Sequence, residues 1–506
     1  MKQKYMKKII WCLSLLFMAG ACSLDYEPTG EYSELTVGGT TEEDGGAVFK
    51  DRAEVLSQYN SLYTTLKGAQ EYWYNDVLLL AESHSDNAYA GTTGAEVIPF
   101  EDNSLNASAS TLERDWNNLM KIVAAANKLI VGIDDVTDSA LTSTERKQWK
   151  AEAKILRAMV FFDMARMWGD FPVVTTLAGD ITAENIEEVF PAYFPEQNTV
   201  EEAYTQIIQD LTEAIADAPD NNPGDKTKLS KSVARALLAK VYAEKPLQDY
   251  KKVIEYADAL QKDGFALAAD YELLFGYNAD TKDCLARNTV EGILEVQYFT
   301  GSGNWATWMF GRKLDNWDES FSWAKWVTPS RDLIRLYDSE GDNIRKNQSI
   351  VYYACTWSNY YPADDYPFMY KLRSSVNSII KLRYADILLL KAEALIMTGD
   401  LPGAAAIINT VRGRVGLGAL PANATSSKDS MIDALLKERR MELAFEGQRW
   451  FDLCRLGKVE EVMNAVYAKD SGRLPQKALF TEYSYRMPIP QNILDMNSNL
   501  VQNPGY

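Results

Sequence analysis

The residues best suited to recognise a ligand are tryptophans gathered in one segment of the chain. Five of the twelve tryptophans lie between residues 305 and 326. They are Trp305, Trp308, Trp317, Trp323 and Trp326, with polar residues interleaved. Sugar rings have apolar C–H faces that stack on indole, and rigid aromatic side chains lose little entropy on binding. The pattern favours a carbohydrate-binding site; the alternative is that individual tryptophans belong to the core.

Catalytic and metal-binding chemistry has little support in the sequence. His84 is the only histidine, so a Ser-His-Asp triad or a histidine-rich zinc site would depend on it alone. Glycoside hydrolysis needs two carboxyl groups that face each other across a groove, and Asp86, Asp315 and Asp318 are the residues that could be recruited. We expect no enzyme activity, no cofactor and no metal ion. An all-helical glycoside hydrolase is the less favoured alternative.

The first 22 residues have the pattern of a lipoprotein signal. Four lysines between residues 2 and 8 precede an apolar run, residues 9–18, that is too short to span a bilayer. Small residues then lead directly to Cys22, whose thiol is the expected site of acylation. We predict a signal peptide at 1–21, lipidation of Cys22 and a flexible, Gly-rich tether at 22–50.

The charge of the chain argues against nucleic acid as a partner. The full sequence carries a net charge of −19, and loss of four lysines with the signal peptide makes it about −23 (−19 − 4). Proteins neutralise nucleic-acid phosphates with Lys and Arg side chains. We therefore expect no binding of DNA or RNA.

Hydrophobic residues recur at helical spacing through most of the mature chain. Val55, Tyr59, Leu62 and Leu66 mark one such face. The pattern predicts helices at 112–134, 143–168, 200–217, 229–244, 249–262, 381–398, 402–414 and 428–455. We expect a mainly α single domain at 51–506, with its helical scaffold at 51–262 and 381–506. Between these parts, residues 265–375 are aromatic and rich in Gly and Asn, which is typical of a functional loop region. A strand is indicated there at 292–297.

One predicted helix is apolar nearly all round. It lies in residues 151–172 (AEAKILRAMVFFDMARMWGDFP). A helix of this kind is buried, so Arg157, Asp163 and Arg166 must be paired or must reach solvent along their stems.

A second segment carries acid–base pairs at helical spacing. In residues 438–458 (ERRMELAFEGQRWFDLCRLGK), Glu446 stands three residues before Arg449, and Asp452 three before Arg455. Paired carboxylates can serve acid–base catalysis. Buried ion pairs that join helices are the favoured reading.

These two segments resemble signature helices of the SusD/RagB family, surface lipoproteins of Bacteroidetes nutrient-uptake systems. Further blocks follow in the family's order: residues 116–130 (WNNLMKIVAAANKLI), 381–400 (KLRYADILLLKAEALIMTGD), 487–494 (MPIPQNIL) and 503–506 (NPGY). The resemblance covers residues 22–506. It implies a SusD-like α-helical body with four tetratricopeptide-like helix pairs and an irregular, loop-rich ligand-binding half.

The resemblance also implies a function and a location. Family members hold oligosaccharide, or sometimes peptide, over a TonB-dependent SusC-like outer-membrane transporter. We expect a glycan-binding protein that is lipid-anchored in the outer membrane and faces the cell exterior. The alternative within the family is a peptide-binding protein.

Glycan-binding members of the family carry an aromatic arc, and its later position transfers to Trp323. This residue is found by counting back from the helix expected at 330–337. The earlier loop of the arc matches residues 85–87, and Tyr89 becomes its candidate aromatic residue.

The earlier loop also supplies polar candidates. Asp86 and Asn87 are the expected hydrogen-bonding residues. Because this loop lacks a tryptophan, the aromatic residues that could compensate are Tyr72, Trp73 and Tyr74. A second aromatic patch at 352–370, which includes Trp357, Tyr360 and Tyr361, is assigned equally to core or site.

Overall fold

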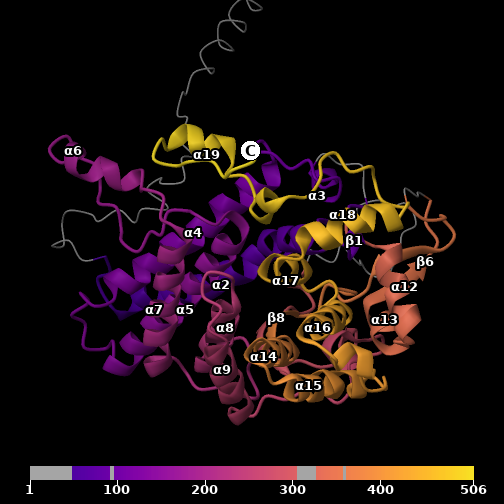
Figure 1. Ribbon diagram of the computed structural model, residues 1–506. Coiled ribbons are helices and arrows are strands. Elements are labelled where there is room, and N and C mark those ends of the chain that lie inside the picture. The colour runs from indigo at the N-terminus through magenta and orange to yellow at the C-terminus, as the bar shows by residue number, and fades with distance from the viewer. Residues whose placement is uncertain (1–47, 92–95, 305–325, 357–359) are drawn as a thin grey trace, which may run out of the picture.

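Helices make up most of the molecule (Figure 1). The structure is a computed structural model that describes residues 48–91, 96–304, 326–356 and 360–506, with only the backbone described at 70–72 and 74–76. The fold is mainly α, as predicted. Within these ranges, no helix combines the length and the apolar character that crossing a membrane requires.

Eight helices form four consecutive pairs. The pairs are α2 (Arg52–Leu78) with α4 (Ser110–Gly132), α5 (Ser143–Trp168) with α7 (Val200–Asp217), α8 (Lys231–Ala243) with α9 (Tyr250–Lys262), and α14 (Tyr384–Thr398) with α15 (Leu401–Arg414). Successive pairs also touch, because α4 packs on α5, α7 on α8 and α9 on α14. Each pair thus buries its apolar faces against its neighbours, as in tetratricopeptide arrays.

The remaining helices extend this row or connect it to the loops. Towards the C-terminus they are α16 (Lys428–Glu442), α17 (Arg449–Arg455), α18 (Val459–Lys469) and α19 (Gln491–Met496). Shorter ones are α3 (Ile98–Glu101), α6 (Ile186–Val189), α10 (Glu272–Phe275), α12 (Arg331–Glu340) and α13 (Asn343–Ser349). A π-helix, η2 (Leu79–Ser83), follows α2, and 3₁₀ turns are η3 (Phe190–Tyr193), η6 (Ala422–Thr425) and η7 (Glu482–Tyr485).

The strands of the described residues form four small antiparallel sheets. The pairs are β1 (Ala88–Tyr89) with β5 (Thr328–Pro329), β2 (Tyr277–Asn278) with β3 (Asp283–Cys284), β4 (Gly292–Val296) with β8 (Ile379–Arg383), and β6 (Ile350–Tyr353) with β7 (Tyr366–Met369). The strand predicted at 292–297 is present as β4, which is buried along its whole length. Its pairing with β8 joins the loop-rich stretch to the start of α14.

Capping residues fix the ends of the two helices whose predicted bounds match those observed, α5 and α7. The side chains of Thr142 and Thr199 accept hydrogen bonds from the backbone N–H groups of Glu145 and Glu202, whose carboxylates bond back to the capping residue. These capping boxes satisfy donors that the first turn leaves free. At a C-terminal end, α14 stops at Gly399, whose backbone lies in the left-handed region with φ of 93°.

Two predicted helices differ from those observed, one in where it begins and the other by a break. The helix expected at 381–398 begins at Tyr384, because the preceding residues form β8. The helix expected at 428–455 breaks between α16 and α17, where Phe445 and Gly447 have φ of 63° and 73°. The break has a structural purpose: the Gly447 N–H donates to the buried Glu82 carboxylate at 3.1 Å.

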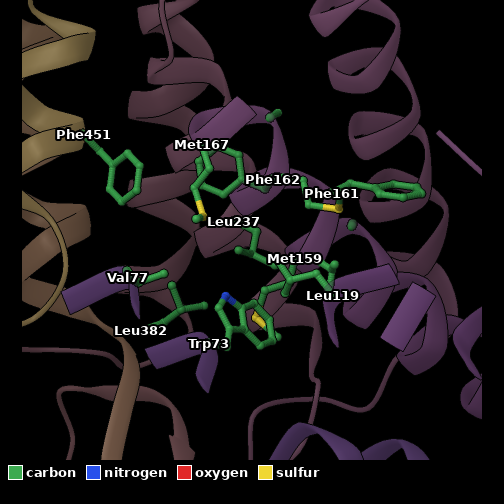
Figure 2. Close-up of a cluster of buried hydrophobic side chains, with 14 of the residues drawn as sticks. Trp73, Val77, Leu119, Met159, Phe161, Phe162, Met167, Leu237, Leu382 and Phe451 are labelled. Atoms are coloured by element: carbon green, nitrogen blue, oxygen red, sulfur yellow. The ribbon is translucent and has the colours of Figure 1, made fainter. Parts of the chain in front are cut away.

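One hydrophobic core joins the N-terminal helices to segments from the C-terminal half. Figure 2 shows part of it, with side chains from α2, α4, α5 and α8 packed beside β8 and α17. Its labelled members include Trp73, Val77, Met159, Phe162, Leu237, Leu382 and Phe451. Full burial of one such side chain stabilises the fold by about 1.5–3 kcal/mol. A smaller cluster packs α14, α15 and α16 together.

The three charged residues of α5 that were predicted to be buried, Arg157, Asp163 and Arg166, are paired inside the protein. Arg157 donates to both carboxylate oxygens of Asp210, at 2.8 and 2.6 Å. Arg166 pairs with Asp163, and its guanidinium group lies between the rings of Phe162 and Phe451. These contacts satisfy charges that burial would otherwise make costly.

The two acid–base pairs predicted in 438–458 have different outcomes. Asp452 pairs with Arg455 at 2.9 Å, as predicted. The pair of Glu446 with Arg449 is wrong, because the break before α17 removes the helical spacing on which it rests. Glu446 instead pairs with Arg383 and Lys371, at 2.5 Å each.

Candidate functional site

The ends of the tryptophan-rich segment are joined to the body by buried residues. Before the segment, the backbone N–H of the buried Asn304 donates to the Ser375 carbonyl oxygen at 2.6 Å. After it, Trp326 packs partly buried against the main core, and Val327 is buried. Thr328 then enters β5, which pairs with β1 through Tyr89. The predicted ligand contacts Trp305, Trp308, Trp317 and Trp323 lie outside the described residues.

Tyr89 lies inside a cluster of aromatic rings and guanidinium groups. Its ring stacks on Tyr360 with centroids 4.7 Å apart, and its hydroxyl donates to the Asp470 carboxylate. That hydroxyl also accepts the backbone N–H of Arg331 at 3.0 Å. The Arg473 guanidinium lies 5.4 Å from the ring centroid. Burial, above all, raises the pKa of Tyr89 to about 12.

Close packing around this cluster depends on a glycine. A Cβ placed on Gly472 would collide with the Arg331 guanidinium and would lie 2.9 Å from the Tyr89 hydroxyl. The Tyr89 side chain has no exposed surface. The direct ligand contact expected of Tyr89 is therefore corrected: in this structure the ring holds β1, α12 and the 470–474 turn together.

The second aromatic patch is divided between the interior and its edge. Tyr360 is buried, and its hydroxyl donates to Glu101 at 2.6 Å. Tyr361 is half-buried, and its hydroxyl donates to the Pro329 carbonyl oxygen at 2.8 Å. Trp357 lies outside the described residues. Tyr360 and Tyr361 thus connect α3 and β5 to the patch, whereas Tyr352 is exposed.

Asp86 is held by two arginines. Both of its carboxylate oxygens accept hydrogen bonds from Arg449, at 2.7 and 2.8 Å, and Arg440 lies 3.2 Å away. Burial alone would raise the pKa of Asp86, but Arg440 and Arg449 overcome that effect and hold the pKa well below its usual range. This buried carboxylate stays ionised and so does not act as a general acid, and both of its oxygens are engaged by arginines.

Asn87 belongs to the same buried network. Its Nδ2 donates to Glu82 at 2.7 Å, and its Oδ1 accepts from Arg440 Nε at 2.8 Å. Burial raises the pKa of Glu82 to about 7. The ligand-binding roles expected of Asp86 and Asn87 are therefore corrected to structural roles, because every side-chain polar atom of the pair is engaged inside the protein.

Trp73 is also part of the interior. Its indole N–H donates to Asp163 at 2.6 Å, and the Lys381 ammonium lies 3.7 Å from its ring centroid. The side chain is buried in the main core (Figure 2). Its expected role as a compensating ligand contact is corrected for this reason.

The basic residues that complete these networks, Arg440 and Arg473, are not apparent from the sequence, because most of their partners lie far away along the chain. Arg473 reaches the carbonyl oxygen of Ser85, 388 residues away along the chain. For Arg440, the only signal in the sequence is the run of charged residues at 438–442, which is of the kind that forms buried ion pairs.

Asp315 and Asp318 lie outside the described residues, and the described carboxyl groups with a raised pKa lie in the interior. Carboxyl groups whose pKa is raised by burial include Glu82, Glu101, Glu152 and Glu295, and all four side chains are buried. Glycoside hydrolysis requires such a group at an accessible groove. Within the described ranges, no group of three or more His, Cys, Asp or Glu side chains is placed to hold a metal ion.

Known proteins match both halves of the chain. A family model described as the SusD family matches residues 341–506, and another, described as starch-binding associating with outer membrane, matches residues 42–243. SusD-like protein P2 of Formosa agariphila is 26% identical over 538 residues, which covers 99% of each chain.

Solved structures share the fold. A laminarin binding SusD-like protein superimposes with a TM-score of 0.69 at 24% identity, covering 90% of this chain and 100% of that one. Surface glycan-binding protein A from Bacteroides fluxus gives a TM-score of 0.72 at 21% identity, with 90% and 100% covered. Both halves of the sequence and the whole helical architecture lead to one assignment: the chain belongs to the SusD/RagB family.

Proposed function

We propose that this protein captures oligosaccharides at the cell surface and delivers them to a TonB-dependent SusC-like outer-membrane transporter. The observation that carries the proposal is the gathering of five tryptophans between two segments anchored in the body, Asn304 and β5. The similarity to a laminarin binding protein and to a surface glycan-binding protein supports a carbohydrate ligand. The proposed contacts are Trp305, Trp308, Trp317, Trp323 and Trp326.

Binding without catalysis fits the same observations. A stacking surface needs no proton donor. Among the described residues, the carboxyl groups whose pKa is raised by burial lie in the interior. The outer-membrane location is supported by the description of the family model that matches the N-terminal half. The lipid anchor at Cys22 and the exposure to the cell exterior complete the proposal.

The glycan-binding proposal is tested by calorimetry against a panel of oligosaccharides and peptides. We expect an oligosaccharide to bind and Trp323→Ala to weaken its affinity at least tenfold, since a central tryptophan contact contributes about 1.4 kcal/mol or more. Phe190→Ala is the matched control, because Phe190 is an exposed aromatic residue of η3 outside the proposed site. Its affinity should equal that of the unmodified protein.

Other outcomes of the same experiment separate the alternatives. Binding of peptides but not of glycans would replace the carbohydrate proposal with a peptide-binding one. Unchanged glycan affinity in Trp323→Ala and in a variant lacking all five tryptophans would remove the proposed site. Release of new reducing ends from the bound glycan would contradict binding without catalysis.

The lipid anchor is tested by replacing Cys22 with alanine. Without the thiol there is no site for acylation, so the protein should lose palmitate labelling and leave the outer-membrane fraction. Cys284→Ala is the control, since this half-buried thiol lies in the folded body and its loss should leave labelling intact. Equal labelling of Cys22→Ala and the unmodified protein would exclude the anchor.

A further inference from the structure

A small cavity lies where α2, α5, α8, β8 and the link between α16 and α17 meet. Its volume is about 40 Å³. A buried water needs roughly 10–15 Å³, so the space holds about three or four waters and is too small for a sugar ring. The polar side chains at its wall are Asp163, Arg166, Lys240, Lys381, Glu446 and Gln448.

The hydrogen-bond acceptors at the wall are already engaged. The side-chain oxygens of Asp163, Glu446 and Gln448 all accept hydrogen bonds from buried donors. The donors are Trp73 and Arg166 for Asp163, Lys371 and Arg383 for Glu446, and Lys240 for Gln448. The wall therefore offers few free acceptors to a ligand that must donate hydrogen bonds.

The donors at the wall are not fully engaged. The Lys381 ammonium lies 3.6 Å from the Asp163 carboxylate, which is beyond hydrogen-bond distance, and 3.7 Å from the Trp73 ring centroid. Its side chain is only 11% exposed. Arg166 leaves its buried Nε without an acceptor. An ammonium group has three N–H donors, so the wall has an excess of donors.

The wall also has an excess of positive charge. Arg166 and Lys381 share one carboxylate, Asp163, whereas Lys240 has its own buried partner in Asp386. Burial, followed by the effect of the neighbouring cations, lowers the pKa of Lys381 to about 8 although Asp163 opposes the shift. A negative charge in the cavity would offset this potential.

We propose that the cavity binds one small inorganic anion, of the size of chloride, against Lys381. A halide only accepts hydrogen bonds, which suits a wall of free donors and occupied acceptors. A water there would have to direct its own two hydrogens at oxygens that are already bonded. The volume favours a monatomic ion over larger oxyanions.

The proposed anion links separate parts of the chain. Lys381 belongs to β8, Arg166 and Asp163 to α5, Lys240 to α8, and Glu446 to the α16–α17 link. The ion would neutralise cations contributed by both halves at the point where their cores merge. Chloride is therefore a stabilising ligand of the fold, separate from the proposed glycan site.

The first test is a crystal of the full chain soaked in sodium bromide and measured at the bromine absorption edge. We expect an anomalous peak in the cavity, in contact with Lys381 Nζ. This measurement requires no variant and so does not depend on how a substitution folds. Density without anomalous signal would mean that water alone fills the cavity, and the proposal would fail.

The second test is thermal unfolding in sodium chloride and in sodium gluconate at equal ionic strength. A ligand at about 100 times its dissociation constant should raise the Tm of a chain of this size by about 2 °C. Lys381→Met should remove the chloride-specific rise. Lys391→Met, which removes a surface lysine of α14 paired with Asp258, should retain it. Equal Tm of the unmodified protein in both salts would overturn the proposal.

Discussion

Replacing Glu442 by glutamine is expected to lower the free energy of unfolding by about 3–5 kcal/mol, because it removes the shared partner of three buried arginines. The Glu442 carboxylate pairs with Arg345 at 3.0 Å, with Arg383 at 2.6 Å and with Arg414. Glu442 and Arg345 have no exposed side-chain surface. The loss is a large share of the roughly 5–15 kcal/mol that stabilises a typical protein.

The same carboxylate predicts a dependence of stability on pH. Burial would raise the pKa of Glu442, but Arg414, Arg383 and Arg345 overcome it and hold the pKa well below the ordinary value. A group whose pKa is lower in the folded state stabilises the protein above its unfolded pKa, about 4.3 for Glu. That contribution is lost as the pH falls from there towards the folded pKa.

Denaturant titrations between pH 3 and 7 measure both effects. The unmodified protein should lose stability below about pH 4.3 more steeply than Glu442→Gln, which cannot titrate at this position. Glu255→Gln is the control, since Glu255 forms an exposed pair with Lys252 and its loss should change stability by about 0.5 kcal/mol or less. Equal stability of Glu442→Gln and Glu255→Gln would contradict a structural role for the cluster.

The helical scaffold was predictable because its signals are local. Spacing of apolar residues identified the faces that pack, and the threonine caps of α5 and α7 mark their first turns. The same local signals failed between α16 and α17. Nothing in the spacing of Glu446 and Arg449 reveals that Phe445 and Gly447 leave the helical region.

The candidate site was less predictable because exposure depends on distant parts of the chain. The family resemblance selected Tyr89 by its position in the sequence. Its burial results from Asp470, 381 residues away, and from Arg331 and Arg473. A family resemblance identifies the matching position in the sequence. Which residues cover that position depends on the structure of the individual protein.

The burial of these residues indicates how the proposed binding surface is held in place. Three residues expected to contact the ligand, Asp86, Asn87 and Tyr89, lie buried just before or within β1, and their contacts fix the position of this strand. Because β1 pairs with β5, the same network fixes the residue at which the tryptophan-rich segment rejoins the body. Buried contacts of this kind orient a binding surface without touching the ligand.

Asp86→Asn is expected to lower the free energy of unfolding by about 3 kcal/mol or more, because Arg449 would remain buried without its carboxylate partner and Arg440 would keep only the partly exposed Asp332. Asp332→Asn is the matched control. Asp332 pairs with Arg440 at 2.8 Å, but its side chain is 20% exposed, so its loss should cost about 1 kcal/mol or less. Denaturant titration of both variants measures the difference.

Ligand affinity then shows whether Asp86 supports the binding site or contacts the ligand. If Asp86 supports the site, Asp86→Asn should bind the oligosaccharide identified in the panel with nearly unchanged affinity per folded molecule at low temperature. If it contacted the ligand, the variant would keep its stability and lose affinity, because a charged hydrogen bond to a sugar hydroxyl contributes about 1.5–3 kcal/mol. The bidentate contact with Arg449 and the complete burial of Asp86 favour the first result, since the carboxylate can reach a ligand only by leaving both arginines.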